Sequence, residues 1–178
     1  MGPTYHYQMN IEVISPNKLM WQNKPYLCAL GQGGVTFNKR EGDGASPIGH
    51  WPLVSVYYRP DRVTRPNTRL PVRALLPSDG WCDDQSHASY NQLIQRPFPG
   101  TYEPLWRNDD VYNLIIILDY NNDPVVPGRG SAIFIHLARP DFAPTQGCVA
   151  LKLKDLSTIL IECSTETSLV IHPVPQPA

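Results

Sequence analysis

The sequence predicts a mainly β fold. Short apolar runs alternate with turn residues along most of the chain, which is typical of short strands joined by loops. The 19 prolines and 12 glycines supply those turns. Only the stretch from Leu153 to Cys163 places its apolar residues at helical spacing. We therefore expect mixed sheets of short strands with one or two short helices.

The N-terminal part of the chain predicts a three-stranded antiparallel meander between Met9 and Leu30. Turn residues separate three apolar runs, which are Ile11 to Ile14, Leu19 to Trp21 and Tyr26 to Leu30. A Gly-rich turn follows, and Val35 to Phe37 is expected to form a further short strand.

A loop and a longer strand come next. Arg40 to Gly49 reads REGDGASPIG, which is too rich in Gly, Asp and Pro for regular structure, and its simplest interpretation is a surface loop. Trp51 to Tyr58 predicts a strand. Side chains alternate along a strand, so we expect Val54, Val56 and Tyr58 on one face and Leu53, Ser55 and Tyr57 on the other.

The segment from Arg59 to Tyr102 is the least regular part of the chain. A loop region this long in a compact domain is usually functional or disordered. Its aromatic and paired polar residues favour an ordered lid or cleft wall. The alternative is a solvated excursion whose arginines only pair with nearby aspartates.

The C-terminal part predicts a buried strand, a helix and a last strand. Val111 to Tyr120 is apolar on both faces, as expected of a central strand that is covered on both sides. Leu153 to Cys163 predicts a short helix that starts near Asp155, and Leu169 to His172 predicts a final strand. No repeat or linker divides the chain, so we expect one domain over residues 1–178.

The composition narrows the classes of function. The formal net charge is −1 and the basic residues are scattered, so we expect no nucleic-acid partner. No apolar run is long enough to span a bilayer and no leader-like segment is present, so we expect a cytoplasmic protein with no membrane partner. Met1 to Pro3 are compatible with a removed leader, in which case the periplasm is expected.

The cysteines and histidines show no metal-ligand spacing. The four cysteines lie far apart without a CxxC pair, so we expect neither a metal nor a cofactor, and a thiol-rich metal protein is a poorly supported alternative. Cys28 and Cys163 sit among aliphatic residues, as core thiols do. Cys82 sits in a polar loop.

The candidate chemistry lies between Gly130 and Leu151. In an extended Ala132 to Ala138, His136 points away from the face that carries the aliphatic residues Ile133, Ile135 and Leu137. The chain returns at Gly147 to Leu151, another expected strand, which would place Cys148 beside His136.

A nucleophilic cysteine needs a partner, because a thiol near its free pKa of ~8.5 is mostly protonated at neutral pH. His136 would act as the base for Cys148. Gly147 lets the backbone approach a substrate closely, and the amide groups around Gln146, Gly147 and Cys148 would face a developing oxyanion. Spacing alone leaves the commoner alternative open, which is a core thiol and a structural histidine.

Two segments resemble a known enzyme family. IFIHLARPDFAPTQGCVALKLKDL is similar to the catalytic signature of the YkuD or L,D-transpeptidase family, in which a histidine on a strand precedes an (S/T)xGC segment and an Asp-Leu helix. REGDGASPIG similarly resembles the GDGxTPxG loop of that family. The resemblance covers most of the chain from Lys39 to Leu160, including segments typical of a short subgroup.

The resemblance implies a YkuD-like β-sandwich and a cysteine enzyme of peptidoglycan stem peptides. Cys148 is then the nucleophile that attacks the L-centre carbonyl of the meso-diaminopimelyl–D-Ala bond, with His136 as its base, and it holds a thioester. Thr145 is the Ser/Thr of the signature and with Gln146 contacts substrate, and Gly147 belongs to the oxyanion segment. Carbapenem-type inhibitors are expected to react with the same thiol.

The sequence departs from the family pattern at three places. Leu137 replaces a common glycine, the loop after the histidine is short, and Ala150 replaces an arginine. A terminal D-Ala carboxylate favours a bidentate cation. We therefore expect a substitute among four arginines, which are Arg129, Arg139, Arg59 and Arg62.

The acyl acceptor distinguishes the functions that the resemblance allows. The lack of a leader, an anchor and a wall-binding segment favours water, and hence an L,D-carboxypeptidase that trims recycled muropeptides. The alternatives are an L,D-transpeptidase that uses a stem-peptide amine or a D-amino acid, and a non-catalytic module that binds peptidoglycan fragments.

Overall fold

The computed structural model describes residues 9–175. It is mainly β, as the sequence predicts, with 35% of residues in strands and 5% in helix. Met1 to Pro3, considered above as the remnant of a leader, lie outside the described residues.

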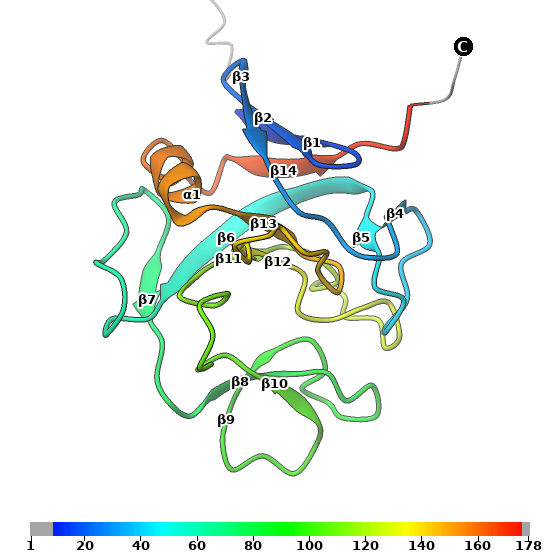
Figure 1. The fold of residues 1–178 in the computed structure, drawn as a ribbon. Coiled ribbons are helices and arrows are strands. Elements are labelled where there is room, and N and C mark those ends of the chain that lie inside the picture. Colours follow the sequence, from blue (N-terminus) through cyan, green and yellow to red (C-terminus); the bar gives the residue numbers. More distant parts are fainter. Residues whose placement is uncertain (1–8, 176–178) are drawn as a thin grey trace, which may run out of the picture.

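One large mixed sheet forms the body of the molecule (Figure 1). From one edge to the other its strands are β13 (Val149–Leu151), β12 (Phe134–Leu137), β11 (Leu114–Leu118), β6 (Gly49–Tyr58), β14 (Ser168–Ile171), β1 (Asn10–Ile14), β2 (Lys18–Trp21) and β3 (Lys24–Leu27). β1, β2 and β3 form the expected antiparallel meander, and β14 is the expected last strand.

The long strand β6 joins the two halves of this sheet. Gly49 to Pro52 pair antiparallel with β14. Leu53 to Tyr58 pair antiparallel with β11, and the last three of these residues also pair in parallel with β7 (Val72–Ala74). β6 therefore connects the strands near both termini to β11 and β12.

The two edges of the sheet meet. After β3, Ala29 forms an isolated antiparallel bridge with Ala150 of β13, and their backbone groups exchange two hydrogen bonds of 2.9 Å. The sheet thus curls around the larger apolar core, to which each strand of the order above contributes buried side chains, including Tyr26 of β3. Helix α1 (Leu153–Leu160) covers this core with Leu156, Ile159 and Leu160, as the helical spacing predicts.

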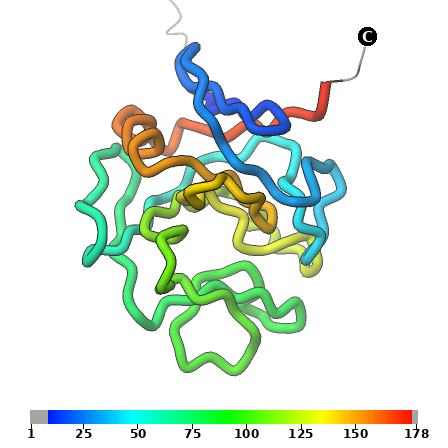
Figure 2. Tube along the Cα trace, viewed as in Figure 1, coloured from blue at the N-terminus to red at the C-terminus, as the bar shows by residue number. Residues whose placement is uncertain are grey.

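A smaller antiparallel sheet covers the other face of β11 and β12. It consists of β10 (Tyr102–Pro104), β8 (Asp79–Cys82) and β9 (Leu93–Gln95). A second apolar cluster lies between the sheets, where the Trp81 and Phe134 rings meet edge to face at 5.0 Å. All of β11 is buried, which confirms the expected central strand. Figure 2 shows this green region opposite the blue N-terminal strands.

The alternation expected for β6 is wrong at two residues, Leu53 and Val54. Ile117 of β11 pairs with Ser55 but Leu118 pairs with Leu53, so Val54 is an extra residue in a β-bulge. The bulge puts Leu53 into the same core as Val56 and leaves Val54 39% exposed.

The segment from Arg59 to Tyr102 is ordered and contains β7, β8 and β9. It contains arginine–aspartate pairs, as one interpretation expects, and a residue of a cavity wall, as the other expects. Arg73 donates to both carboxylate oxygens of the fully buried Asp79, at 2.6 and 3.0 Å. Asp83, in contrast, forms part of a cavity wall.

The bulge makes the two valines of β6 unequal in stability. Val56→Ala should lower the free energy of unfolding by about 2 kcal/mol, because it leaves a cavity in the core. Val54→Ala should change it by less than about 0.5 kcal/mol. Urea unfolding followed by fluorescence measures both, and equal losses would contradict the bulge.

Candidate active site

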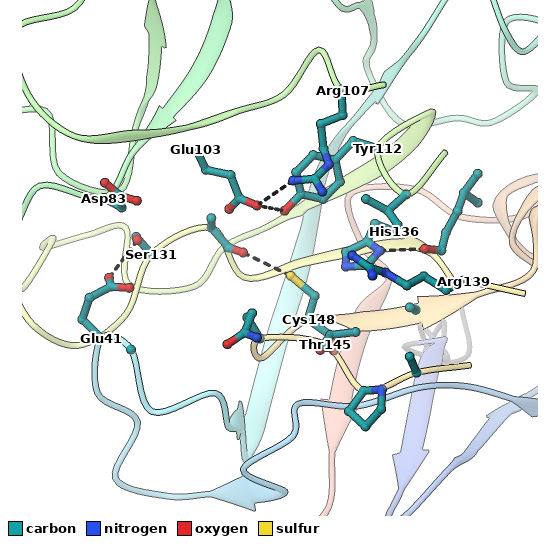
Figure 3. Close-up of a pocket in the computed structure, with 18 of the residues that line it drawn as sticks. Glu41, Asp83, Glu103, Arg107, Tyr112, Ser131, His136, Arg139, Thr145 and Cys148 are labelled. Carbon is teal, nitrogen blue, oxygen red and sulfur yellow. Dashed lines mark hydrogen bonds and ion pairs between the residues drawn. The ribbon is translucent and has the colours of Figure 1, made fainter. Parts of the chain in front are cut away.

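Two neighbouring strands bring together the two residues that the motif singles out. β12 and β13 run in parallel, with His136 opposite Ala150, and Cys148 directly precedes β13. The side chains of Cys148 and His136 line one cavity of about 420 Å³, as Figure 3 shows. Only 6% and 7% of the two residues are exposed. The expected adjacency on neighbouring strands is therefore present.

The imidazole of His136 is held in one orientation. Its Nδ1 lies 2.9 Å from the carbonyl oxygen of Leu137. A carbonyl oxygen only accepts, so Nδ1 carries the proton and Nε2 keeps its lone pair. Tyr112 packs edge-on against the ring at 5.3 Å. Burial lowers the pKa of His136 to about 4, so Nε2 is an unprotonated base at neutral pH.

The thiol of Cys148 contacts two backbone groups. Its Sγ donates to the carbonyl oxygen of Ala132 at 3.2 Å and accepts the N–H of Phe134 at 3.3 Å. Within residues 9–175 no hydrogen bond joins this sulfur to His136. Burial raises the pKa of Cys148 to about 12. The resting pair is therefore a neutral thiol beside a neutral imidazole.

Thr145 fixes the turn that precedes Cys148. Its Oγ1 donates to the carbonyl oxygen of Cys148 at 2.7 Å and accepts the N–H of Gly147 at 3.1 Å. The Gly147 N–H is thus occupied, which removes it from the expected oxyanion donors. The N–H groups of Gln146 and Cys148 form no hydrogen bond with any residue that the structure describes, so they are the candidate donors.

Glycines let the two motifs touch. Gly147 has φ +133°, and a Cβ there would lie 2.8 Å from the carbonyl oxygen of Ala45. A Cβ on Gly31 would lie 2.2 Å from the carbonyl oxygen of Gly44. These approaches admit only glycine, so the GDG loop packs directly against the turn of Cys148.

Asp43 organises the GDG loop, which is a cavity wall and not a free surface loop. Its carboxylate accepts the N–H groups of Arg40 and Ala45 at 2.7 and 2.9 Å. The Lys39 ammonium donates to it at 2.5 Å. These partners hold the pKa of Asp43 below its usual range, against the opposing effect of burial. The neighbouring Glu41 lines the cavity.

The cavity has an acidic side and a basic side. Figure 3 shows Glu41 and Asp83 on the side of Cys148 opposite to His136 and Arg139. Burial raises the pKa of Glu103, and the nearby carboxylates add to the effect. Oδ1 of Asp83 is buried and has no hydrogen-bond partner within residues 9–175.

One of the four expected arginines reaches the cavity. Arg139 lines it, with 58% of its side chain exposed and a carboxylate oxygen of Asp109 at 4.0 Å. Thr145 and Gln146 also line it. The structure does not bring Arg129, Arg59 or Arg62 to the cavity wall.

Two of these arginines are engaged elsewhere, which corrects their expected role. Arg59 is 4% exposed and binds both carboxylate oxygens of Asp61 at 2.8 Å. Arg62 donates to the carbonyl oxygens of Asn108 and Asp109 at 3.1 and 2.9 Å. Both side chains brace the segment that leads into β11.

Sequence reasoning missed Arg107, Tyr112 and Glu103, all of which line the cavity. The Tyr112 hydroxyl donates to Glu103 at 2.7 Å, and the Arg107 guanidinium lies 5.2 Å from the Tyr112 ring centroid. The sequence held a signal for Tyr112. If the expected strands Val111 to Tyr120 and Ala132 to Ala138 pair antiparallel, the start of the first, with Tyr112, lies beside the end of the second, with His136.

A comparison with known protein families identifies the family of this chain. The model of the YkuD L,D-transpeptidase catalytic domain matches residues 7–171. The chain belongs to this family. YkuD membership makes it an L,D-transpeptidase-type enzyme of peptidoglycan peptides. No curated protein matches the chain. In the part of the YkuD domain that the structure describes, no helix has the length and apolar character needed to cross a membrane.

The buried neutral His136 should make the stability of this YkuD domain pH-dependent. An unfolded histidine takes up a proton near pH 6.5, whereas the folded one resists until about pH 4. Between these values the unfolded chain binds more protons, so stability is complete above this window and falls as the pH falls through it. Urea unfolding at several pH values measures the slope, which should be smaller for His136→Gln. An identical slope in both proteins would contradict the shift.

Proposed function

We propose that this YkuD protein is an L,D-carboxypeptidase, a cysteine acyl enzyme that releases the terminal D-Ala from peptidoglycan tetrapeptides of the kind that muropeptide recycling supplies. The observation that carries the proposal is the cavity shared by Cys148 and His136, with Nδ1 of the imidazole committed to Leu137 and Nε2 left as the base. A thiol nucleophile and a base in a fixed tautomer are the two groups that this kind of acyl transfer requires.

The first half-reaction forms a thioester. The thiol of Cys148 turns from the Ala132 carbonyl, Nε2 of His136 takes its proton, and the sulfur attacks the L-centre carbonyl of the diaminopimelyl–D-Ala bond. The N–H groups of Gln146 and Cys148 face the resulting oxyanion. The imidazolium then gives its proton to the D-Ala nitrogen as the C–N bond breaks, and D-Ala leaves with both its oxygens.

Water completes the reaction. Nε2 of His136 removes a proton from water, the hydroxide attacks the thioester, and the C–S bond breaks as the proton returns to sulfur. The volume of about 420 Å³ is in the lower part of the range for one small ligand. A water acceptor needs no space beyond the acyl donor, whereas the amine of a second stem peptide does.

The charges of the cavity suit a diaminopimelyl substrate. That residue ends in an ammonium and a carboxylate, and the terminal D-Ala adds another carboxylate. Arg139, which lines the cavity with 58% of its side chain exposed, is our candidate for the arginine that is absent at Ala150. Arg107 adds positive charge to the cavity wall, but its guanidinium donates to both carboxylate oxygens of Asp109 at 2.8 and 2.7 Å. Asp83 and Glu41 supply negative charge for the ammonium.

Product analysis tests the reaction. Incubation with disaccharide tetrapeptide should yield tripeptide and free D-Ala, detected by mass spectrometry. Cys148→Ala should lower the rate at least about a thousandfold, because the nucleophile is lost. Cys82→Ala is the matched control, since Cys82 is equally buried but does not line the cavity, and it should retain activity within about threefold. Cross-linked dimers would show that the acyl acceptor is an amine and not water. No turnover at all would overturn the proposal.

The acidic wall should govern substrate binding. Asp83→Asn should raise KM for the tetrapeptide about tenfold with little change in kcat, because it removes a charge for the substrate ammonium and because Asp83 takes no part in the proposed proton transfers. Asp84→Asn is the control, since the neighbouring carboxylate binds Ser86 and does not line the cavity. Equal KM values for the two variants would contradict the role of Asp83.

A further inference from the structure

The residue that holds the sulfur of Cys148 has an unusual backbone. Ala132 has φ +53°, a left-handed conformation that residues other than glycine and asparagine rarely adopt, and only 7% of it is exposed. Its carbonyl oxygen accepts the Cys148 thiol at 3.2 Å. The direction of that carbonyl depends on the strained φ.

Asn91 contacts the strained residue from the other side. Its Oδ1 accepts the Ala132 N–H at 3.1 Å and the Trp81 indole N–H at 2.9 Å. Its Nδ2 donates to the carbonyl oxygens of Tyr120 and Asn121 at 3.0 and 2.9 Å. The amide orientation is unambiguous, because the reverse would set its NH2 against two N–H donors.

We propose that Asn91 is a positioning residue for the nucleophile, a role that rests on the proposed function. It holds Ala132 in the left-handed conformation, and the Ala132 carbonyl then aims the thiol of Cys148. Among neutral side chains of this length only asparagine combines an acceptor for two N–H groups with donors for two carbonyls. Asn91 itself has φ +57°, which asparagine tolerates.

The hydrogen bond from Cys148 to the Ala132 carbonyl affects both the position of Sγ and the protonation of the thiol. The Phe134 N–H and the Ala132 carbonyl bracket Sγ from two sides, so its position is set before a substrate arrives. An accepted S–H favours the neutral thiol over the thiolate. Loss of the Ala132 carbonyl should therefore ease ionisation of Cys148 while it misplaces the sulfur for attack.

Two readouts on the full chain test this role. The pH profile of Cys148 alkylation by iodoacetamide, read for that cysteine by mass spectrometry, should shift to lower pH in Asn91→Ala. The kcat for tetrapeptide should fall about tenfold with KM nearly unchanged. Asn91→Asp keeps the acceptor for Ala132 and loses both donations, so its kcat should stay within about threefold of the parent.

Further variants separate positioning from folding. Trp81→Phe breaks another hydrogen bond of the same Asn91 and should leave the alkylation profile unchanged. Ala132→Gly takes the left-handed conformation without strain, so combined with Asn91→Ala it should recover most of the lost kcat.

The alkylation profile is measurable without turnover, so its outcome is independent of the proposed reaction. A folded Asn91→Ala with the parent profile, an equal shift in Trp81→Phe, or a failure of Ala132→Gly to restore kcat would each overturn the positioning role. If Asn91→Ala does not fold, a tenfold loss of kcat in Asn91→Asp would overturn the positioning role. Absence of tetrapeptide turnover in the parent protein would refute the carboxypeptidase reaction alone.

Discussion

The parallel pairing of β12 and β13 is the constraint on which the candidate site depends. Antiparallel neighbours can be joined by a tight turn, but parallel neighbours cannot. The chain must therefore leave the sheet after Leu137 and return at Val149. That excursion carries Thr145 to Cys148 and forms one wall of the cavity. The turn that holds Cys148 thus exists because the topology requires a long connection, and the glycines let the GDG loop pack against it.

The parts of the fold that depend on local periodicity were predictable from the sequence. The meander, the buried strand β11 and helix α1 each follow from apolar spacing that one segment displays by itself. The bulge at Val54 was not predictable, because an extra residue in a strand is defined only against its partner β11. Arg59 binds Asp61, a pairing that the alternative interpretation of its segment allowed, and it does not line the cavity.

The candidate site divides in the same way. Cys148 and His136 were accessible to sequence reasoning because they lie on two adjacent strands and within a recognisable motif. Arg107, Tyr112 and Glu103 come from an irregular segment whose path is set by contacts far along the chain. Ala132 carried no sequence signal, because its left-handed φ is imposed by its surroundings and not by its residue type.

The raised pKa of Cys148 has a consequence for redox chemistry. Peroxides oxidise thiolates much faster than thiols, and oxidation also requires access to the sulfur. A thiol that is protonated and buried is therefore protected from conversion to sulfenic acid. If Cys148 is the nucleophile, as we propose, the same burial that keeps it neutral also lengthens the time for which the protein keeps a usable thiol.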